Sequence, residues 1–217
     1  EEITPGAWVD LCAPTEEEIL RVSTQLELDP AAIRAALDEE ERSRIEAEDD
    51  YLLVLVDTPC VEEQSKRGFV YTTLPFGIIL TQDNIITVRL KESALARAFT
   101  DSPVKNFSTR KKNRMTLQML YRNATLFLFY LRELEKASNR VENELHVSMR
   151  NKELIQMLGL EKSLVYFSTS LKGNELVLEK LLRMDFVKNF PDDTDLLEDV
   201  IIENKQAIEM ANIYRDI

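Results

Sequence analysis

Side chains that hold transition metals or build disulfide frameworks are scarce in this sequence. It has two cysteines, Cys12 and Cys60, far apart and without a CxxC spacing, and one histidine, His146. A zinc module or a disulfide framework is therefore not expected, and both cysteines are interpreted as neutral thiols in a reducing compartment. Five glycines and seven prolines are few for an all-β protein of 217 residues, which favours helices.

The sequence also lacks an excess of positive charge and any long apolar run. Its 39 acidic and 27 basic side chains give a net charge of −12, the opposite of the balance that a nucleic-acid groove needs. No segment approaches the ~20 consecutive apolar residues of a membrane span, and no signal peptide is present. Without a nucleophile elbow, a phosphate loop or a metal-histidine motif, the chain is not expected to be an enzyme.

The first half alternates short helical and strand patterns. A capping-box spacing of Thr15 and Glu18 begins one helix, and Pro30 begins a second that runs to Leu37. The continuous apolar run Tyr51–Thr58 predicts a central strand covered on both faces. Further strands are predicted at 7–11, in FVYTTLPFGIILT and in NIITVRL. The fold class expected is α+β, a mixed or antiparallel sheet sandwiched by helices.

The second half has the pattern of long helices. From Met115 to Leu145 apolar residues recur at alternating steps of three and four, as in packed helices. A second helix is expected at 153–185, with an apolar side that includes Leu154 and Leu182. A third, capped by Asp193 or Thr194, has no stop signal at Ile217, and because the chain also begins with Glu1 we expect a fragment. The expected domains are 1–110, an α/β sandwich, and 111–217, a long-helix region ending in a truncated stalk helix.

The densest group of carboxylates lies in DEEERSRIEAEDDYLLVLV, from Asp38 to Val56. At a net charge of −12 such a cluster is unremarkable, and most of its acids are interpreted as solvated flanks of a short helix and a buried strand. The basic run RKKNR, 110–114, is interpreted as a solvated linker or an intersubunit ion pair.

Three segments stand out by their order and spacing: WVDL near the start, LELDPAAIRAALDEEERSRIEAEDDYLLVLV, and LLEDVIIENKQAIEMANIYRDI at the end. Together they resemble the CorA family of divalent-cation transporters, and the resemblance covers nearly the whole chain. In the family a proline is usual where Ser43 stands. The family's Gly-Met-Asn motif at the pore mouth would lie beyond Ile217.

The resemblance implies the cytoplasmic regulatory domain of a homopentameric transporter in the cell (inner) membrane, with membrane contact only through segments beyond Ile217. The ion implied is Mg²⁺, with Co²⁺, Ni²⁺ or Zn²⁺ as alternatives. In the family, ions bound between neighbouring subunits hold the channel closed, and their loss opens it. The partners implied are other copies of the chain and divalent cations, with no nucleic acid.

The resemblance also implies a metal site at the start of the last helix. Asp199 matches an aspartate of the family's stalk helix, which pairs with an acid on the short helix of the adjacent subunit. Glu203, one turn on, shares a helix face with Asp199. The partner positions fall on Arg34 and Ala35, which cannot ligate a cation, and another acid of the family falls near Ala124. Asp38, one turn beyond Ala35 on the same helix, is the nearest substitute.

Two other interpretations stay open. Each of these acids could be a solvated helix residue, favoured near a helix N-terminus by the helix dipole. The chain could also be a soluble helical module that docks a partner protein and transports no ion.

Overall fold

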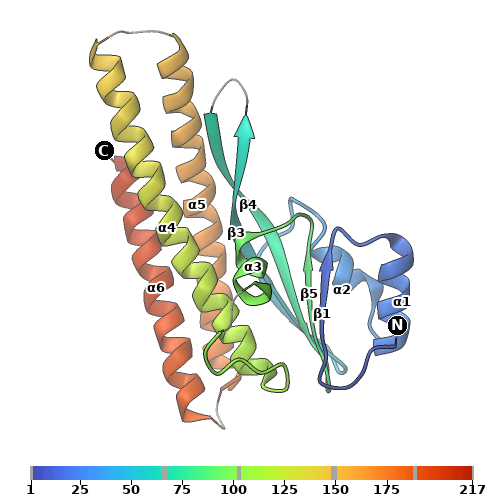
Figure 1. Cartoon of the computed structure of the whole chain (residues 1–217). Coiled ribbons are helices and arrows are strands. Elements are labelled where there is room, and N and C mark those ends of the chain that lie inside the picture. Colours follow the sequence, from blue (N-terminus) through green and yellow to red (C-terminus); the bar gives the residue numbers. More distant parts are fainter. Residues whose placement is uncertain (1, 65–67, 102–103, 148–150, 188–189, 217) are drawn as a thin grey trace.

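The computed structural model describes residues 2–64, 68–101, 104–147, 151–187 and 190–216 (Figure 1). Strands and short helices make up the first half, and three long helices make up the second. In chain order the elements are β1 (Trp8–Cys12), α1 (Glu16–Leu26), α2 (Pro30–Ala35), β2 (Arg44–Ala47), β3 (Leu52–Gln64), β4 (Gly68–Leu80), β5 (Ile85–Arg89), α3 (Ala94–Thr100), α4 (Lys112–Val147), α5 (Asn151–Arg183) and α6 (Pro191–Asp216).

The strands form one five-stranded sheet in the order β1-β5-β4-β3-β2. The neighbours β5, β4, β3 and β2 are antiparallel, whereas β1 pairs in parallel with β5, with Trp8 opposite Ile85. The expectation of a mixed sheet is confirmed. Strands β3 and β4 pair over thirteen residues, from Leu52 opposite Leu80 to Gln64 opposite Gly68, so this hairpin extends beyond the other strands (Figure 1).

Helices cover both faces of the sheet. Successive side chains of a strand point to opposite faces. Leu53 and Leu55 of β3 accordingly pack in a cluster with α1 and α2, and Val54 and Val56 pack in another with the long helices. In Figure 1, α1 and α2 lie to the right of the sheet and α4, α5 and α6 to its left. The predicted central strand is confirmed, as is the sandwiched sheet, while the division at residue 110 stays a prediction.

The local signals for the two short N-terminal helices are also confirmed. Thr15 caps α1, and its hydroxyl accepts a hydrogen bond from the Glu18 amide at 3.2 Å while the Glu18 carboxylate accepts one from the Thr15 amide at 2.8 Å. Pro30 begins α2, with Asp29 as the cap.

Two elements were missed: strand β2, where RSRIE was interpreted as a turn, and helix α3. Strand β2 has four residues and one buried side chain, Ile45, so its alternation is a weak signal. In α3 the buried residues Leu95, Ala96 and Phe99 have a helical spacing that sequence reasoning did not use.

Helices α4 and α5 form an antiparallel pair, and α6 packs against both (Figure 1). The predicted apolar stripe of α4 is buried from Leu117 to Val141. The stripe predicted for α5 is wrong at its ends, because Leu154 and Leu182 are exposed. The buried positions of α5 also include small polar residues, which a search for leucine periodicity does not find: Ser163, Ser168, Ser170 and Asn174. Of these, Ser163 and Ser170 form hydrogen bonds to β4, and Asn174 to β3.

Asn174 joins α5 to β3 and to the segment before β2. Its side-chain oxygen accepts hydrogen bonds from the Asp57 amide at 2.9 Å and from the Ser43 hydroxyl at 3.0 Å. Its side-chain nitrogen donates to the Asp57 carbonyl at 2.9 Å. One step away along α5, Gly173 has no side chain, and a Cβ there would lie 3.3 Å from the Ser43 hydroxyl oxygen. The close approach of α5 to the sheet therefore depends on these two residues.

We expect Asn174→Ala to lower the free energy of unfolding by about 2 kcal/mol, because the Asp57 amide and the Ser43 hydroxyl lose their partner away from bulk water. Urea denaturation measures the change. The matched control is Thr169→Ala on the same helix, whose exposed hydroxyl bonds only to the Val165 carbonyl and whose loss should cost less than about 0.5 kcal/mol. Equal losses in the two variants would contradict this role of Asn174.

Candidate functional site

The N-terminus of α6 is fixed to the N-terminus of α4 by a partly buried ion pair. Pro191 begins α6, so the expected capping by Asp193 or Thr194 is wrong, and Asp193 lies within the first turn. The helix dipole favours acids there. Arg114 of α4 donates from Nη1 to the Asp193 carboxylate at 2.7 Å, and Asp193 is buried. The pair sets the position of α6 relative to α4 at this end.

The inner face of α6 packs on α4 and α5 along its length, as its predicted apolar stripe implies. Leu197, Val200, Ala207 and Ala211 are buried in this face. Two polar residues of the same stripe are bonded to the neighbouring helices. Asn204 donates to the Leu171 carbonyl at 3.2 Å, and the Tyr214 hydroxyl donates to the Glu135 carboxylate at 2.8 Å.

Asp199 and Glu203, the two acids predicted on this helix, lie away from its buried stripe. Asp199 is exposed and Glu203 is half-buried. Being four residues apart, their side chains share a face of the helix. Within the part of the chain that the structure describes, neither carboxylate has a hydrogen bond or an ion pair. Two large apolar side chains on the same helix are also exposed, Ile202 (60%) and Ile213 (58%).

Asp38, the third predicted ligand, does not lie on a helix. Helix α2 ends at Ala35, and Asp38 follows it in a turn, where its carboxylate accepts a hydrogen bond from the Glu40 amide at 3.0 Å. The prediction that Asp38 continues the short helix is wrong because the chain leaves the helix after six residues. Asp38 is nevertheless exposed.

The positions that depart from the family pattern have other roles within the chain. Arg34 pairs with Glu16 of α1 at 2.7 Å, and Ala35 packs in the cluster between α2 and the sheet. Ala124 is buried in α4. None of the three positions offers a cation ligand.

Within one chain the structure does not bring Asp38 to Asp199. Asp38 follows α2 on one side of the sheet, and Asp199 lies on α6 on the other side (Figure 1). Among the described residues there is no group of three or more His, Cys, Asp or Glu side chains that could hold a metal ion. A divalent ion at Asp199 would therefore have at most two acidic ligands from the described part of one chain, such as Asp199 and Glu203.

The basic run 110–114 forms contacts within the chain, where a solvated linker or an intersubunit pair was expected. Lys112 donates from Nζ to the carbonyls of Thr81 and Gln82, and Arg114 pairs with Asp193. The remaining two cations, Arg110 and Lys111, are exposed. The side chain of His146 lies outside the described residues.

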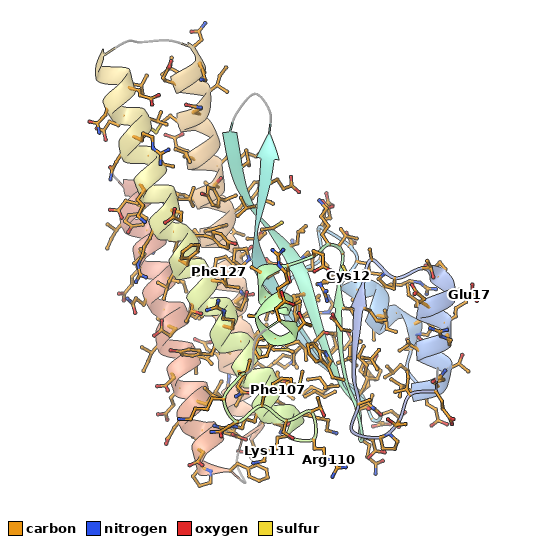
Figure 2. The ribbon with its side chains drawn as sticks, in the orientation of Figure 1. Cys12, Glu17, Phe107, Arg110, Lys111 and Phe127 are labelled. Atoms are coloured by element: carbon orange, nitrogen blue, oxygen red, sulfur yellow. The ribbon has the colours of Figure 1, made fainter. Side chains whose placement is uncertain are left out.

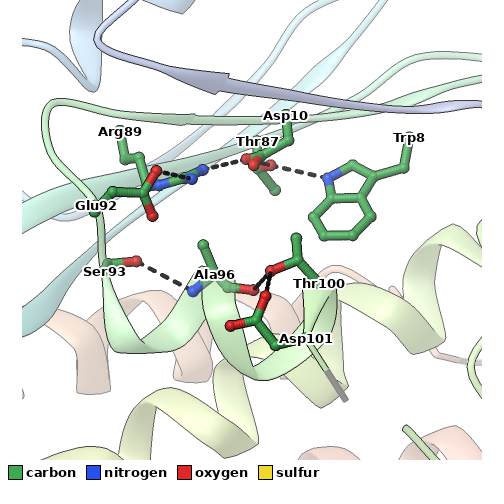
Figure 3. Close-up of polar contacts among 9 residues, drawn as sticks. All are labelled: Trp8, Asp10, Thr87, Arg89, Glu92, Ser93, Ala96, Thr100 and Asp101. Carbon is green, nitrogen blue, oxygen red and sulfur yellow. Dashed lines mark hydrogen bonds and ion pairs between the residues drawn. The ribbon is translucent and has the colours of Figure 1, made fainter. Parts of the chain in front are cut away.

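A polar network that sequence reasoning missed holds the carboxyl end of β5 (Figure 3). The Arg89 guanidinium is buried and pairs with the Asp10 carboxylate and, at 3.3 Å, with Glu92. The Thr87 hydroxyl donates to Asp10 at 2.7 Å and accepts from the Trp8 indole at 2.9 Å. Acid and base lie 79 residues apart in sequence, so no local pattern signals the pair.

The two cysteines are unpaired thiols, Cys12 near Arg89 and Cys60 on β3. Burial raises the pKa of each thiol, so both are protonated at neutral pH. This agrees with the interpretation of neutral thiols.

Residues 6–217 match the family described as CorA-like Mg²⁺ transporter protein. A curated relative, the cobalt/magnesium transport protein CorA of Methanocaldococcus jannaschii, is 27% identical over 224 residues. The match covers 97% of this chain but only 66% of that protein. No helix among the described residues combines the length and the apolar character that a membrane crossing requires.

Two solved structures have the same fold. The soluble domain of CorA from Methanocaldococcus jannaschii superposes with a TM-score of 0.85 at 24% identity, covering 96% of this chain and 83% of that one. The ZntB cytoplasmic domain from Vibrio parahaemolyticus superposes with a TM-score of 0.69 at 13% identity, covering 99% and 86%. At these identities the likeness establishes the fold alone.

We expect Arg114→Met to lower the free energy of unfolding by about 2 kcal/mol, because it leaves the buried Asp193 carboxylate without its charged donor. The matched control is Arg183→Met on α5, where an exposed pair with Glu179 spans 3.5 Å and should contribute less than about 0.5 kcal/mol. Urea denaturation of both variants gives the comparison. A loss for Arg114→Met no larger than that of the control would show that the pair does not fix α6.

Proposed function

The chain belongs to the CorA-like Mg²⁺ transporter family, and from this premise we propose that it is the regulatory region of a homopentameric divalent-cation transporter. In this proposal it senses the ions inside the cell by binding them between neighbouring copies. The transport itself belongs to the whole protein, of whose curated relative this chain spans 66%.

The observation that carries the proposal is that Asp199 and Glu203 share a face of α6 and neither carboxylate has an ion-pair partner among the described residues. The rest of this helix is fixed, because its N-terminus is held by the Arg114–Asp193 pair and its inner face is buried. The pair is therefore presented on a rigid element, with no cation of the described chain to neutralise it. Ile202, between the two acids, is exposed in a single copy and would be covered if copies associate through this face.

The chemistry of Mg²⁺ suits such a sparse site. Mg²⁺ is usually held by one or two carboxylates and keeps several of its waters. Two acids one helical turn apart can contact one hydrated ion without a dedicated cage. Weak binding also suits a sensor of an abundant ion, since occupancy stabilises the assembly by RT ln(1 + [L]/Kd), which changes most near Kd.

The net negative charge of the chain suggests what a bound cation would do, which is to reduce the repulsion between copies. Each copy carries a net charge of −12, so five copies bring about 60 negative charges around one axis. Such repulsion favours separation of the copies unless cations lie between them. Loss of bound cations at low internal Mg²⁺ would then loosen the assembly, which is the event proposed to open the channel.

Asp38 is proposed as a further ligand, contributed by the neighbouring copy. It is exposed, and its carboxylate accepts a single local hydrogen bond, so it retains acceptor capacity. Because Asp38 follows α2, which packs on the face of the sheet opposite the long helices, a second copy would have to bring it to Asp199. The curated relative is named for cobalt and magnesium, so Mg²⁺ or Co²⁺ is the proposed ion.

We expect millimolar Mg²⁺ to raise the melting temperature of the complete gene product in detergent or liposomes. Asp199→Asn should raise the Mg²⁺ concentration needed for half of this effect by about tenfold or more. Removing even a group that only supports a metal ligand typically weakens metal affinity by about this factor. The charge-matched control is Glu209→Gln, an exposed acid of α6 more than two turns further on, which should leave the concentration unchanged.

A double-variant cycle tests whether Asp38 shares the ion. If it does, Asp38→Asn and Asp199→Asn combined should weaken the Mg²⁺ response by less than the sum of the two single effects. The absence of any Mg²⁺-dependent shift in the unaltered protein would refute the sensor proposal and favour a protein-docking module.

A further inference from the structure

A basic cleft lies at the end of the molecule where α4 and α6 begin. Its volume is about 760 Å³. Its walls are the loop before α4, the first turn of α4 and the first turn of α6. Figure 2 shows Phe107, Arg110 and Lys111 at this end of the long helices. Its lining includes Phe107, Arg110, Lys111, Lys112, Arg114 and Phe190.

Two of the four cations in the cleft are available to a ligand. Lys112 is bonded to the carbonyls of Thr81 and Gln82, and Arg114 to Asp193. Arg110 and Lys111 are exposed, and neither forms an ion pair within the described part of the chain. They are adjacent in sequence at the mouth of a cleft in a protein whose net charge is −12, so the cations are concentrated here against the overall balance.

The start of α4 adds hydrogen-bond donors to these cations. The first helical amides, of Lys112, Asn113 and Arg114, have no partner inside the helix. Lys111 occupies the cap position, because its carbonyl accepts the Met115 amide at 2.9 Å, yet its ammonium group cannot accept a hydrogen bond from an amide. The first turn contains no acid, whereas α1 has three in its first turn and α6 has two. The N-terminus of a helix carries a partial positive charge, so positive side chains there are electrostatically unfavourable. An anion bound between the side chains and the helix start removes this repulsion.

The size and the aromatic wall of the cleft indicate the kind of anion. Amides at a helix start together with Arg and Lys are typical ligands of phosphate groups. A cleft of this volume lies within the range of about 300–1,000 Å³ that holds small organic ligands, so it exceeds the needs of one phosphate. On the α6 side the Phe190 side chain is 59% exposed, and such a ring can stack on a base.

We propose that this cleft binds a nucleoside polyphosphate, with its phosphates at Arg110, Lys111 and the start of α4 and its base against Phe190. Asp192, exposed on the α6 side, repels phosphate and so favours this orientation over the reverse. The ligand would contact the starts of both α4 and α6. This second ligand goes beyond the proposed cation sensing, because it requires none of the acids Asp38, Asp199 and Glu203.

The single tryptophan offers a direct readout. Trp8 contacts Phe107, a wall of the cleft, with ring centroids 6.0 Å apart. Titration with ATP in EDTA, followed by tryptophan fluorescence and calorimetry, should show saturable binding that weakens as salt is added, because the contact is largely between charges. Pyrophosphate should bind more weakly than ATP, and adenosine should not bind measurably.

Variants separate the two halves of the ligand. Arg110→Glu with Lys111→Glu should weaken ATP binding by at least about tenfold, the equivalent of about 1.4 kcal/mol. The control is a charge reversal of the same kind at one position, Lys152→Glu, an exposed cation near the start of α5 at the opposite end of the helices, which should have no effect. Phe190→Ala should weaken ATP but leave pyrophosphate unchanged.

Three results would overturn the proposal. The first is the absence of saturable ATP binding, and the second is an equal effect of the Lys152→Glu control. The third is equal affinity for pyrophosphate and ATP, which would remove the base from the assignment. Because all titrations are made without divalent ions, none of these outcomes depends on the Asp199 site.

Discussion

The sheet has two apolar faces, and both must be kept from water. Along β3, Leu53 and Leu55 point to one side and Val54 and Val56 to the other, so no single layer of helices suffices. The short helices α1 and α2 cover one side, and α4 and α5 cover the other, with α6 packed on these two. Because α4 and α5 are attached to this second face, α6 is held against a rigid support, and the outward direction of Asp199 follows from that attachment.

Sequence reasoning succeeded where a pattern repeats or a cap is chemically specific. The apolar stripe of α4 repeats over about thirty residues. The capping box of Thr15 and Glu18 is specific because it consists of two reciprocal hydrogen bonds between these residues. Sequence reasoning failed for β2, in which one of four side chains, Ile45, is buried, and for the buried face of α5. There Asn174 is buried because it satisfies the backbone of β3, a reason that lies 117 residues away in the sequence.

The two candidate ligand sites differ in how far the sequence could indicate them. Asp199 and Glu203 could be selected because their spacing and the family resemblance are properties of one short segment. Their exposure could not be predicted from the sequence, since it depends on which face of α6 packs against α4 and α5. The basic cleft was not predictable, because Lys111 and Phe190 are brought together only when two helix starts meet. The run RKKNR showed the charge but gave no indication that two of its cations are already bonded.

The parallel pairing of β1 with β5 has a consequence for how the chain acquires its structure. Trp8 and Ile85 are 77 residues apart, and every other strand of the sheet lies between them in the sequence. The hairpin of β3 and β4, by contrast, closes locally. A contact between residues far apart in sequence requires a loss of chain entropy before the contact can stabilise the fold. Folding therefore slows as the share of such contacts increases. We therefore expect β1 to be among the last strands of the sheet to pair, and its apolar residues to stay accessible to other chains until β5 has formed.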